Sequence, residues 1–234
     1  MSENNTIHYL DLDETPLREM NRNFHQMGQD RRGHWRVINP RGRHAVAVGL
    51  DAPLTVEIDG HVGYYCAGMN QQATVLINGN CGVGVAENMM SGRVVVRGNA
   101  SQSAGATGHG GLLVVEGDAA SRCGISMKGM DIVVAGSVGH MSAFMAQAGR
   151  LVVCGDAGEA LGDSLYEARL YVRGTVQSLG ADCVEKPMED EHREELRELL
   201  HLAGLLSRMD VNHFRRYGSA RQLYNFDVDN VDAY

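Results

Sequence analysis

The sequence predicts an all-β chain folded as a right-handed parallel β-helix, a single-stranded solenoid of seven stacked coils of 19 residues. The first observation is a glycine that recurs every 19 residues, at Gly60, Gly79, Gly98, Gly117, Gly136, Gly155 and Gly174. The second is a short apolar run before each of these marker glycines, with aliphatic residues four and two positions ahead of it, such as Val56 and Ile58. Because alternate residues of a strand point to the same side, each pair predicts a strand face that points into a core.

Two further columns of the repeat support this arrangement. Seven residues after each marker the residue is always small, namely Ala67, Ala86, Gly105, Gly124, Ala143, Gly162 and Ala181. Such a column predicts a tight corner, where replacing Gly105 or Gly124 with valine should destabilise the fold. Directly after the markers stand His61, Asn80, Asn99, Asp118, Ser137, Asp156 and Thr175. Most of these residue types bond their own backbone in turns, so we expect turns there.

The flanks predict caps for a stack of coils, which needs covered ends. We expect an N-terminal helical or extended cap over residues 1–50, the β-helix over 51–184, and a C-terminal helix with a docking tail over 185–234. The first helix should begin at Thr15-Pro16-Leu17, with proline at its first position and an apolar stripe formed by Leu17, Met20, Phe24 and Met27. The second should begin at Glu189–Glu191, carry Leu196, Leu199, Leu200 and Ala203 on one side, and stop at Gly204. The tail from Phe214 onward either docks on a partner or packs back on its own rod.

The middle residue of each strand run should point away from the core, yet it is apolar in six of the seven repeats. The column reads Glu57, Leu76, Val95, Val114, Val133, Val152 and Tyr171. A stripe of this length exceeds what a monomer usually exposes, so a flanking helix, the tail or another protein should cover it. The six apolar members are therefore the candidate partner interface. Replacing Val114 and Val133 with glutamate should then leave an isolated rod folded and weaken partner binding.

Composition restricts the partners and the compartment. The chain has 21 basic and 29 acidic residues, a net charge of -8, which argues against nucleic acid or an anionic membrane as the main partner. A polar N-terminus and the lack of a long apolar run argue against a signal peptide or a membrane span, so we expect a cytoplasmic protein. The five cysteines are odd in number and form no C-x-x-C pair. They predict free thiols, with no iron–sulfur cluster held by this chain.

No catalytic constellation emerges from the motifs. The glycine-rich stretch from Gly105 to Gly111 lacks the Lys-Ser/Thr pair that a phosphate-binding loop needs. Histidines occupy different repeat columns, and Asp118 and Asp156 share a column but stand two coils apart with Ser137 between them. We therefore expect no catalytic, cofactor-binding or metal-binding residue in this chain. A self-sufficient β-helix enzyme stays open as an alternative, and would need carboxylates in one column of adjacent coils.

The repeats also resemble a known domain. Gly79-Asn-Cys-Gly, Gly136-Ser-Val-Gly and Gly155-Asp-Ala-Gly, each after an aliphatic strand, are similar to the glycine-patterned (GXGXG) β-helix domain. That domain closes the large subunit of glutamate synthase and occurs in the C subunit of formylmethanofuran dehydrogenase. Within this superfamily the chain resembles the B subunits of N-methylglutamate synthase (methylamine–glutamate N-methyltransferase). The stretches that carry the resemblance are 35–44, 63–70, 86–92, 105–111 and 214–220.

The resemblance implies a division of labour within a hetero-oligomer. A glutamine-amidotransferase-like subunit and a synthase-like subunit, which holds FMN and iron–sulfur clusters, would carry the chemistry. This chain would brace them without binding a cofactor itself. The reaction implied converts methylamine and L-glutamate to N-methylglutamate and ammonia. A related complex that uses another amine and a formylmethanofuran dehydrogenase C-like scaffold remain open.

Overall fold

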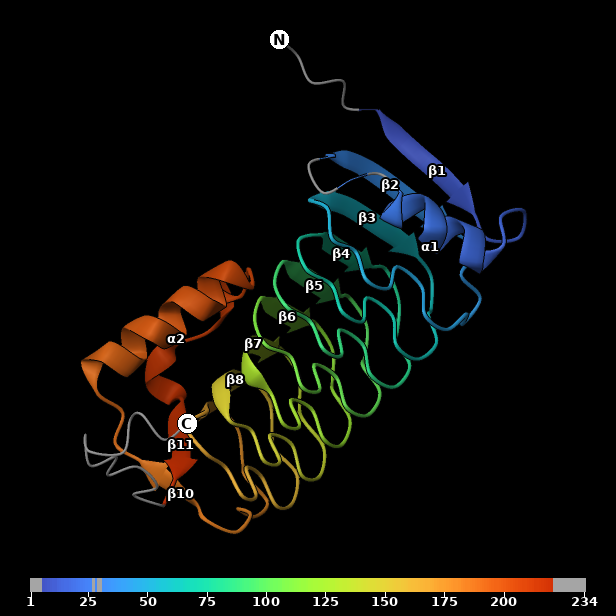
Figure 1. The fold of residues 1–234 in the computed structure, drawn as a ribbon. Helices are drawn as coiled ribbons and strands as arrows, with labels where there is room; N and C mark the ends of the chain where they lie inside the picture. Colours follow the sequence, from blue (N-terminus) through green and yellow to red (C-terminus); the bar gives the residue numbers. More distant parts are fainter. Residues whose placement is uncertain (1–5, 27, 29–30, 221–234) are drawn as a thin grey trace, which may run out of the picture.

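The computed structural model describes residues 6–26, 28 and 31–220, and shows a rod of stacked coils (Figure 1). Nine strands pair in parallel in chain order, which confirms the parallel β-solenoid that the repeat predicts. These strands are β1 (Ile7–Asp11), β2 (Gly33–Ile38), β3 (Leu54–Asp59), β4 (Thr74–Ile77), β5 (Arg93–Val96), β6 (Leu112–Val115), β7 (Lys128–Val134), β8 (Ala148–Val153) and β9 (Arg169–Val172). Equivalent residues of successive repeats face one another, so Val75 lies opposite Val94, and Val94 opposite Leu113. The 19-residue period thus sets which residues of neighbouring strands lie opposite one another.

The small-residue column forms a corner in the left-handed backbone region. Its first six members, from Ala67 to Gly162, have φ between 54° and 69°. The left-handed backbone also occurs at Tyr65, Met69 and Arg122, so lack of space explains the small residues of this column: a Cβ on Gly105 would lie 2.6 Å from Ile132 Cδ1. The turns are also bonded between coils. Tyr65 donates its N–H to the Val83 carbonyl of the next coil, at 2.8 Å, whereas Ala67 donates to the Val46 carbonyl of the preceding one, at 3.0 Å.

The marker positions require glycine because the preceding coil leaves no space for a Cβ atom. A Cβ on any of the six from Gly79 to Gly174 would lie closer than 3.0 Å to the preceding coil, either to its marker backbone or to the polar residue after that marker. Those polar residues form a ladder: each accepts a hydrogen bond from the backbone N–H of its counterpart in the next coil, at 2.7 to 2.9 Å. The expectation that they bond their own turns is wrong. Coils only ~4.8 Å apart bring the next N–H within reach of these short side chains.

The stack extends beyond the seven recognised repeats at its N-terminal end. Trp35 and Val37 of β2 lie opposite Val56 and Ile58 of β3, and the ring of Pro40 occupies the space beside Gly60. Helix α1 (Leu17–His25) lies between β1 and β2 in the chain and buries Met20 and Phe24 in the same core as the coils. It therefore takes the place of the turns of the first coil and closes that end of the interior. Met27, the last member of the expected stripe, lies outside the described residues.

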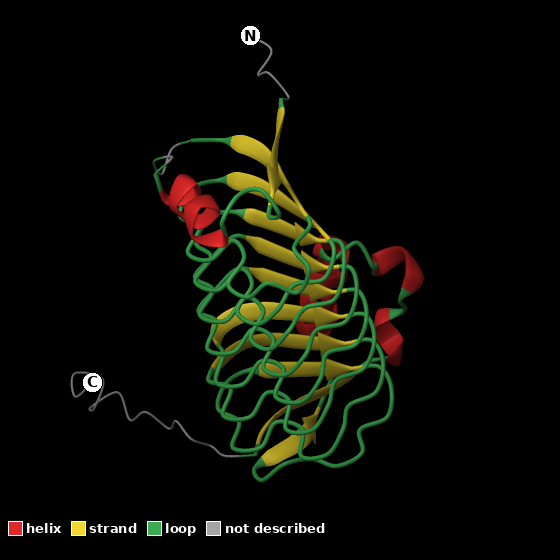
Figure 2. Cartoon of the chain, turned by 90° about the vertical axis from the view of Figure 1, so that its right-hand side faces the viewer, coloured by secondary structure: helices red, strands yellow, loops and turns green. Residues whose placement is uncertain are grey.

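The C-terminal end is finished differently. Helix α2 (Asp190–Leu202) begins and ends where the sequence predicts, with Gly204 in the left-handed region at φ 75°. Two short 3₁₀ turns follow, η1 (Leu206–Arg208) and η2 (Val211–His213), and lead to β11 (Arg215–Ser219). Strand β11 runs antiparallel to β9, and β10 (Cys183–Lys186) then forms the far edge of an 11-stranded sheet (Figure 2). The first part of the expected docking tail thus packs back on its own rod. Residues 221–234 lie outside the described part.

None of the described helices has the length and apolar character that a bilayer crossing demands.

Candidate interaction surfaces

Half of the expected partner interface is covered by the chain itself. Val133, Val152 and Tyr171 are fully buried in a second core, between the outer face of the sheet and α2. The helix contributes Leu196, Leu199 and Leu200, and the following turns add Val211 and Phe214. These three strand residues are therefore not available to a partner, which corrects the expectation for them. The apolar stripe of α2 was read correctly, but it covers the outer sheet face and not an open end of the rod (Figures 1 and 2).

The remaining three members of the column differ in exposure. Val114 is 1% exposed and Val95 is 6% exposed, so both are buried, while Leu76 is partly exposed. Leu76 is therefore the one apolar member of the column that keeps an exposed surface. A glutamate at Val114 or Val133 would enter a buried site, so the expectation that such a rod folds normally is wrong.

A charged network fastens α2 to the sheet. Glu195 of α2 accepts a hydrogen bond from the Tyr171 hydroxyl and pairs with Arg169 at 2.9 Å and Arg150 at 3.5 Å. Arg150 also makes a two-pronged contact with Asp131, at 2.6 Å for each bond. Burial, and then the bond to Glu195, raise the pKa of the Tyr171 phenol, while the hydrogen bond to Asp131 raises the pKa of Arg150. Tyr171 therefore remains a donor and Arg150 a cation, and the network is structural.

Large exposed apolar side chains gather on the N-terminal half of the rod. Six of the ten in the described residues lie between residues 7 and 90: Ile7, Tyr9, Tyr64, Met69, Val83 and Met90. The last four belong to two successive coils, where Tyr64, Met69 and Val83 lie in turns and Met90 follows one, and we call these four residues the turn patch. Tyr64 is 54% exposed and stacks on His44 with 3.8 Å between ring centroids, while Val83, in the same repeat column one coil on, is 46% exposed.

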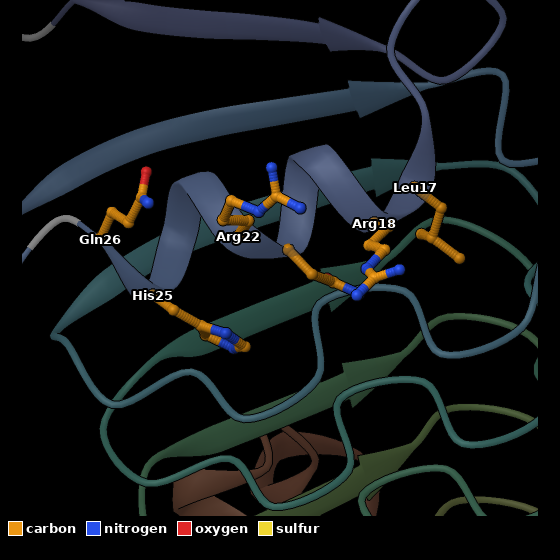
Figure 3. Close-up of a pocket in the computed structure, with 6 residues that line it drawn as sticks. Leu17, Arg18, Arg22, His25 and Gln26 are labelled. Carbon is orange, nitrogen blue, oxygen red and sulfur yellow. The ribbon is translucent and has the colours of Figure 1, made fainter.

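A basic hollow lies along one face of α1 (Figure 3). It has a volume of about 510 Å³ and is lined by Leu17, Arg18, Asn21, Arg22, His25 and Gln26. His25 bonds the Val48 carbonyl at 2.8 Å, and Asn21 donates to the Ala45 carbonyl, so two of these side chains fasten α1 to the next coil. All of the lining lies on α1 or directly after it, at Gln26, so the hollow is an exposed helix face with positive charge and not an enclosed site.

One group of side chains in the described residues has the spacing of metal ligands. Donor atoms of Glu189, Glu191 and His192 lie within 4.8 Å of one another at the start of α2. Glu189 and His192 form a reciprocal capping box, with the Glu189 N–H donating to His192 Nδ1 at 3.3 Å. Both glutamates are exposed. Their arrangement is explained by the helix cap.

The other groups singled out in the sequence also serve the fold. All five cysteines are free, as predicted, and all five are buried, which raises the pKa of Cys81 and Cys123 to about 12. Asp118 and Asp156 are acceptors in the hydrogen-bond ladder. The stretch from Gly105 to Gly111 forms part of a coil turn, and His61 begins the ladder by accepting the Asn80 N–H.

Sequence comparison identifies the family. No protein-family model matches the chain. The chain is similar to Protein GlxC of Rhizobium meliloti (strain 1021), with 64% identity over 226 residues, which cover 96% of this chain and 99% of that protein. The name of that relative states no activity, so the similarity supplies a family and not a reaction. With this identity along nearly the full length of both proteins, the chain belongs to the GlxC family.

Proposed function

We propose that this chain is a non-catalytic structural subunit of a glutamate-synthase-like complex. It braces a glutamine-amidotransferase-like subunit against a synthase-like subunit that holds FMN and iron–sulfur clusters. N-methylglutamate synthase, which forms N-methylglutamate and ammonia from methylamine and L-glutamate, is the complex that the resemblance favours. The buried, unpaired thiols fit a reducing compartment, the cytoplasm.

The construction of the rod supports a bracing role. Each coil is bonded to its neighbours along the strand, through the turns and through the side-chain ladder. Such a stack resists bending at any single coil, because each contact is repeated between every pair of neighbours. Two proteins docked on it are held at a fixed separation. Enzymes that pass a small reactive amine between active sites need such a fixed geometry.

The observation that carries the proposal is the concentration of exposed apolar side chains on the N-terminal half of the rod. The chain covers its own outer face near the C-terminal end with α2, but the turn patch remains open. Tyrosine and methionine are enriched in protein interfaces, and adjacent exposed apolar residues mark such surfaces. We therefore assign the turn patch, together with Leu76, as the surface that meets a partner.

Purification from the native host tests this assignment. The full chain, tagged at one end, is isolated at low salt and analysed by native mass spectrometry and by absorbance. We expect two larger subunits in the eluate, a flavin and iron–sulfur spectrum, and glutamate turnover with methylamine. A colourless chain without partners would contradict the proposal and favour a self-sufficient β-helix protein.

A pair of variants tests the surface. Val83→Glu places a charge in the turn patch and should reduce the recovery of partner subunits at least tenfold. The matched control is Leu202→Glu on α2, where the leucine is 45% exposed on the opposite half of the rod. Both variants should melt close to the wild type because both sites face solvent. Equal recovery of partners with the two variants would exclude the turn patch.

A further inference from the structure

The two edges of the 11-stranded sheet are finished in different ways. Strand β1 forms one edge and β10 the other. An open edge presents unpaired N–H and C=O groups, and proteins usually protect it with charged residues or proline. Strand β10 has this protection, since it contains Glu185 and Lys186 and is followed by Pro187. Strand β1, with the sequence Ile-His-Tyr-Leu-Asp, has one charged residue, Asp11 at its end, and contains neither lysine nor proline.

The backbone of β1 has bonding capacity on its free side. In the described residues β1 pairs with β2 alone. Leu12 donates its N–H to Ile38 across that pair, at 3.1 Å. Because successive residues of a strand send their backbone groups to opposite sides, the groups of Ile7 and Tyr9 point away from β2. Their side chains are 36% and 63% exposed. The edge therefore offers both hydrogen-bonding groups and apolar contact.

From these features we infer that an extended, acidic segment of a partner subunit adds to β1 as a further strand. This inference rests on the proposed function, and it names how one partner attaches. Strand addition to an exposed sheet edge is a general mode of peptide recognition, in which main-chain hydrogen bonds supply affinity and flanking side chains supply specificity.

The charge at this end of the rod selects the chemistry of the segment. Residues 7–50 contain seven arginines and five acidic residues, although the whole chain is acidic. Arg31 and Arg32 are exposed immediately before β2, and because Ile7 lies opposite His34, they flank the start of the β1 edge. The described residues provide no ion-pair partner for either arginine. Acidic side chains on the incoming strand would fill this role.

A second copy of the chain fits the edge poorly. Two-fold pairing of β1 with itself would bring two arginine-rich ends together. Head-to-tail pairing would place β1 against β10, whose edge is protected by charge and proline. Both arrangements are disfavoured by residues that the structure places at the contact.

Hydrogen exchange in the intact complex tests the inference. The tagged full chain is isolated with its partners from the native host, and exchange of the β1 amides is followed by mass spectrometry in the complex and in the chain alone. We expect the Tyr9 amide to exchange at least tenfold more slowly in the complex. Unchanged exchange in a complex that carries flavin would overturn the inference and leave the proposed function standing. Absence of any partner subunit would overturn both.

Substitutions at the two edges provide the matched test. Tyr9→Pro removes an outward N–H that β2 does not use and should lower partner recovery about tenfold or more, whereas Tyr9→Ala keeps the N–H and should lower it less. Ile7→Glu should weaken the complex, because it places a negative charge against the acidic segment, and the same change at the other edge, Val184→Glu, should not. Equal recovery with all four variants would refute strand addition. Dimers of the isolated chain that Tyr9→Pro abolishes would also refute it, because a second copy would then occupy the edge.

Discussion

The glycine column makes a sharp prediction about Gly117→Ala. This glycine does not adopt a positive φ, so an alanine there suffers no backbone strain. Its Cβ would instead lie closer than 3.0 Å to Asn99 Oδ1 and 2.8 Å from the Gly98 carbonyl oxygen. Asn99 can rotate away only by giving up its hydrogen bond to the Asp118 N–H, which is 2.8 Å long. The Gly98 carbonyl accepts a hydrogen bond from the Gly117 N–H at 3.1 Å, so it cannot move as freely.

The expected loss follows from these two contributions. Overpacking against backbone costs about 1–3 kcal/mol, and loss of the ladder bond adds about 0.5–1.5 kcal/mol. A total of about 2–4 kcal/mol should lower the melting temperature by roughly 5–15 °C in a chain of this size. Urea unfolding followed by circular dichroism measures the free energy, and the slope of the transition shows whether unfolding stays cooperative.

A double-mutant cycle separates the two contributions. Asn99→Ala alone should cost about 1 kcal/mol, because it removes one exposed ladder bond. In that background Gly117→Ala no longer meets the amide oxygen, so the combined loss should fall short of the sum by about 1 kcal/mol. Wild-type stability in Gly117→Ala would refute the spatial explanation of the glycine column. Strict additivity would show that the side-chain ladder has no part in it.

Four other changes test separate parts of the structure. Gly105→Val combines φ 68° with a Cβ 2.6 Å from Ile132 Cδ1, and should cost about 3 kcal/mol or more; an unchanged melting temperature would contradict the left-handed corner. Val133→Glu should destabilise the isolated chain by about 4 kcal/mol or more, because the side chain is fully buried beneath α2; a normal melting curve would show that α2 does not cover it. Tyr171→Phe and Glu195→Gln each remove a contact that holds α2 on the sheet, so limited proteolysis should cleave residues 187–214 faster in both variants. Cleavage at the wild-type rate would contradict this role of the contact. Burial raises the pKa of the Cys123 thiol to about 12, so about one molecule in ten thousand should carry the thiolate at pH 8. Cys123 should therefore react with a thiol reagent only when the chain unfolds, and immediate reaction would show that it is exposed.

The repeat predicted the register because one physical cause acts at every coil. Val56, Val75 and Val94 stand opposite one another, as a 19-residue period requires. The coil that contains β2 is not apparent from the repeat because Trp35 and Val56 are 21 residues apart, and because Asn39, which follows the Ile38–Asp59 pair, stands where the other coils have the marker glycine. A longer coil can still stack if the extra residues bulge from a turn. A strict 19-residue period therefore does not predict the coil at which the stack begins.

The interface residues were predicted less well, for a reason that concerns α2. Its apolar stripe, including Leu196 and Leu199, indicated a buried face, but a stripe does not say which surface it meets. From the sequence, neither the outer column of the sheet nor the apolar stripe of α2 had an identified packing partner. In the structure the two surfaces pack against each other. Glu195 and Tyr171 complete that pairing through a contact between residues 24 apart in the sequence, which no local pattern reveals.

The ends of the rod differ in whether they permit the sheet to grow. At the C-terminal end β11 runs against the direction of β9, and β10 adds a protected edge, so a parallel stack stops there. At the N-terminal end α1 fills the interior with Met20 and Phe24 but leaves the outer edge of β1 without a described partner. A helix that plugs the core removes the need for another complete coil, yet it does not satisfy the backbone of the last strand. Strand addition without a further coil satisfies that backbone, and it places the attachment point on the same half of the rod as the turn patch.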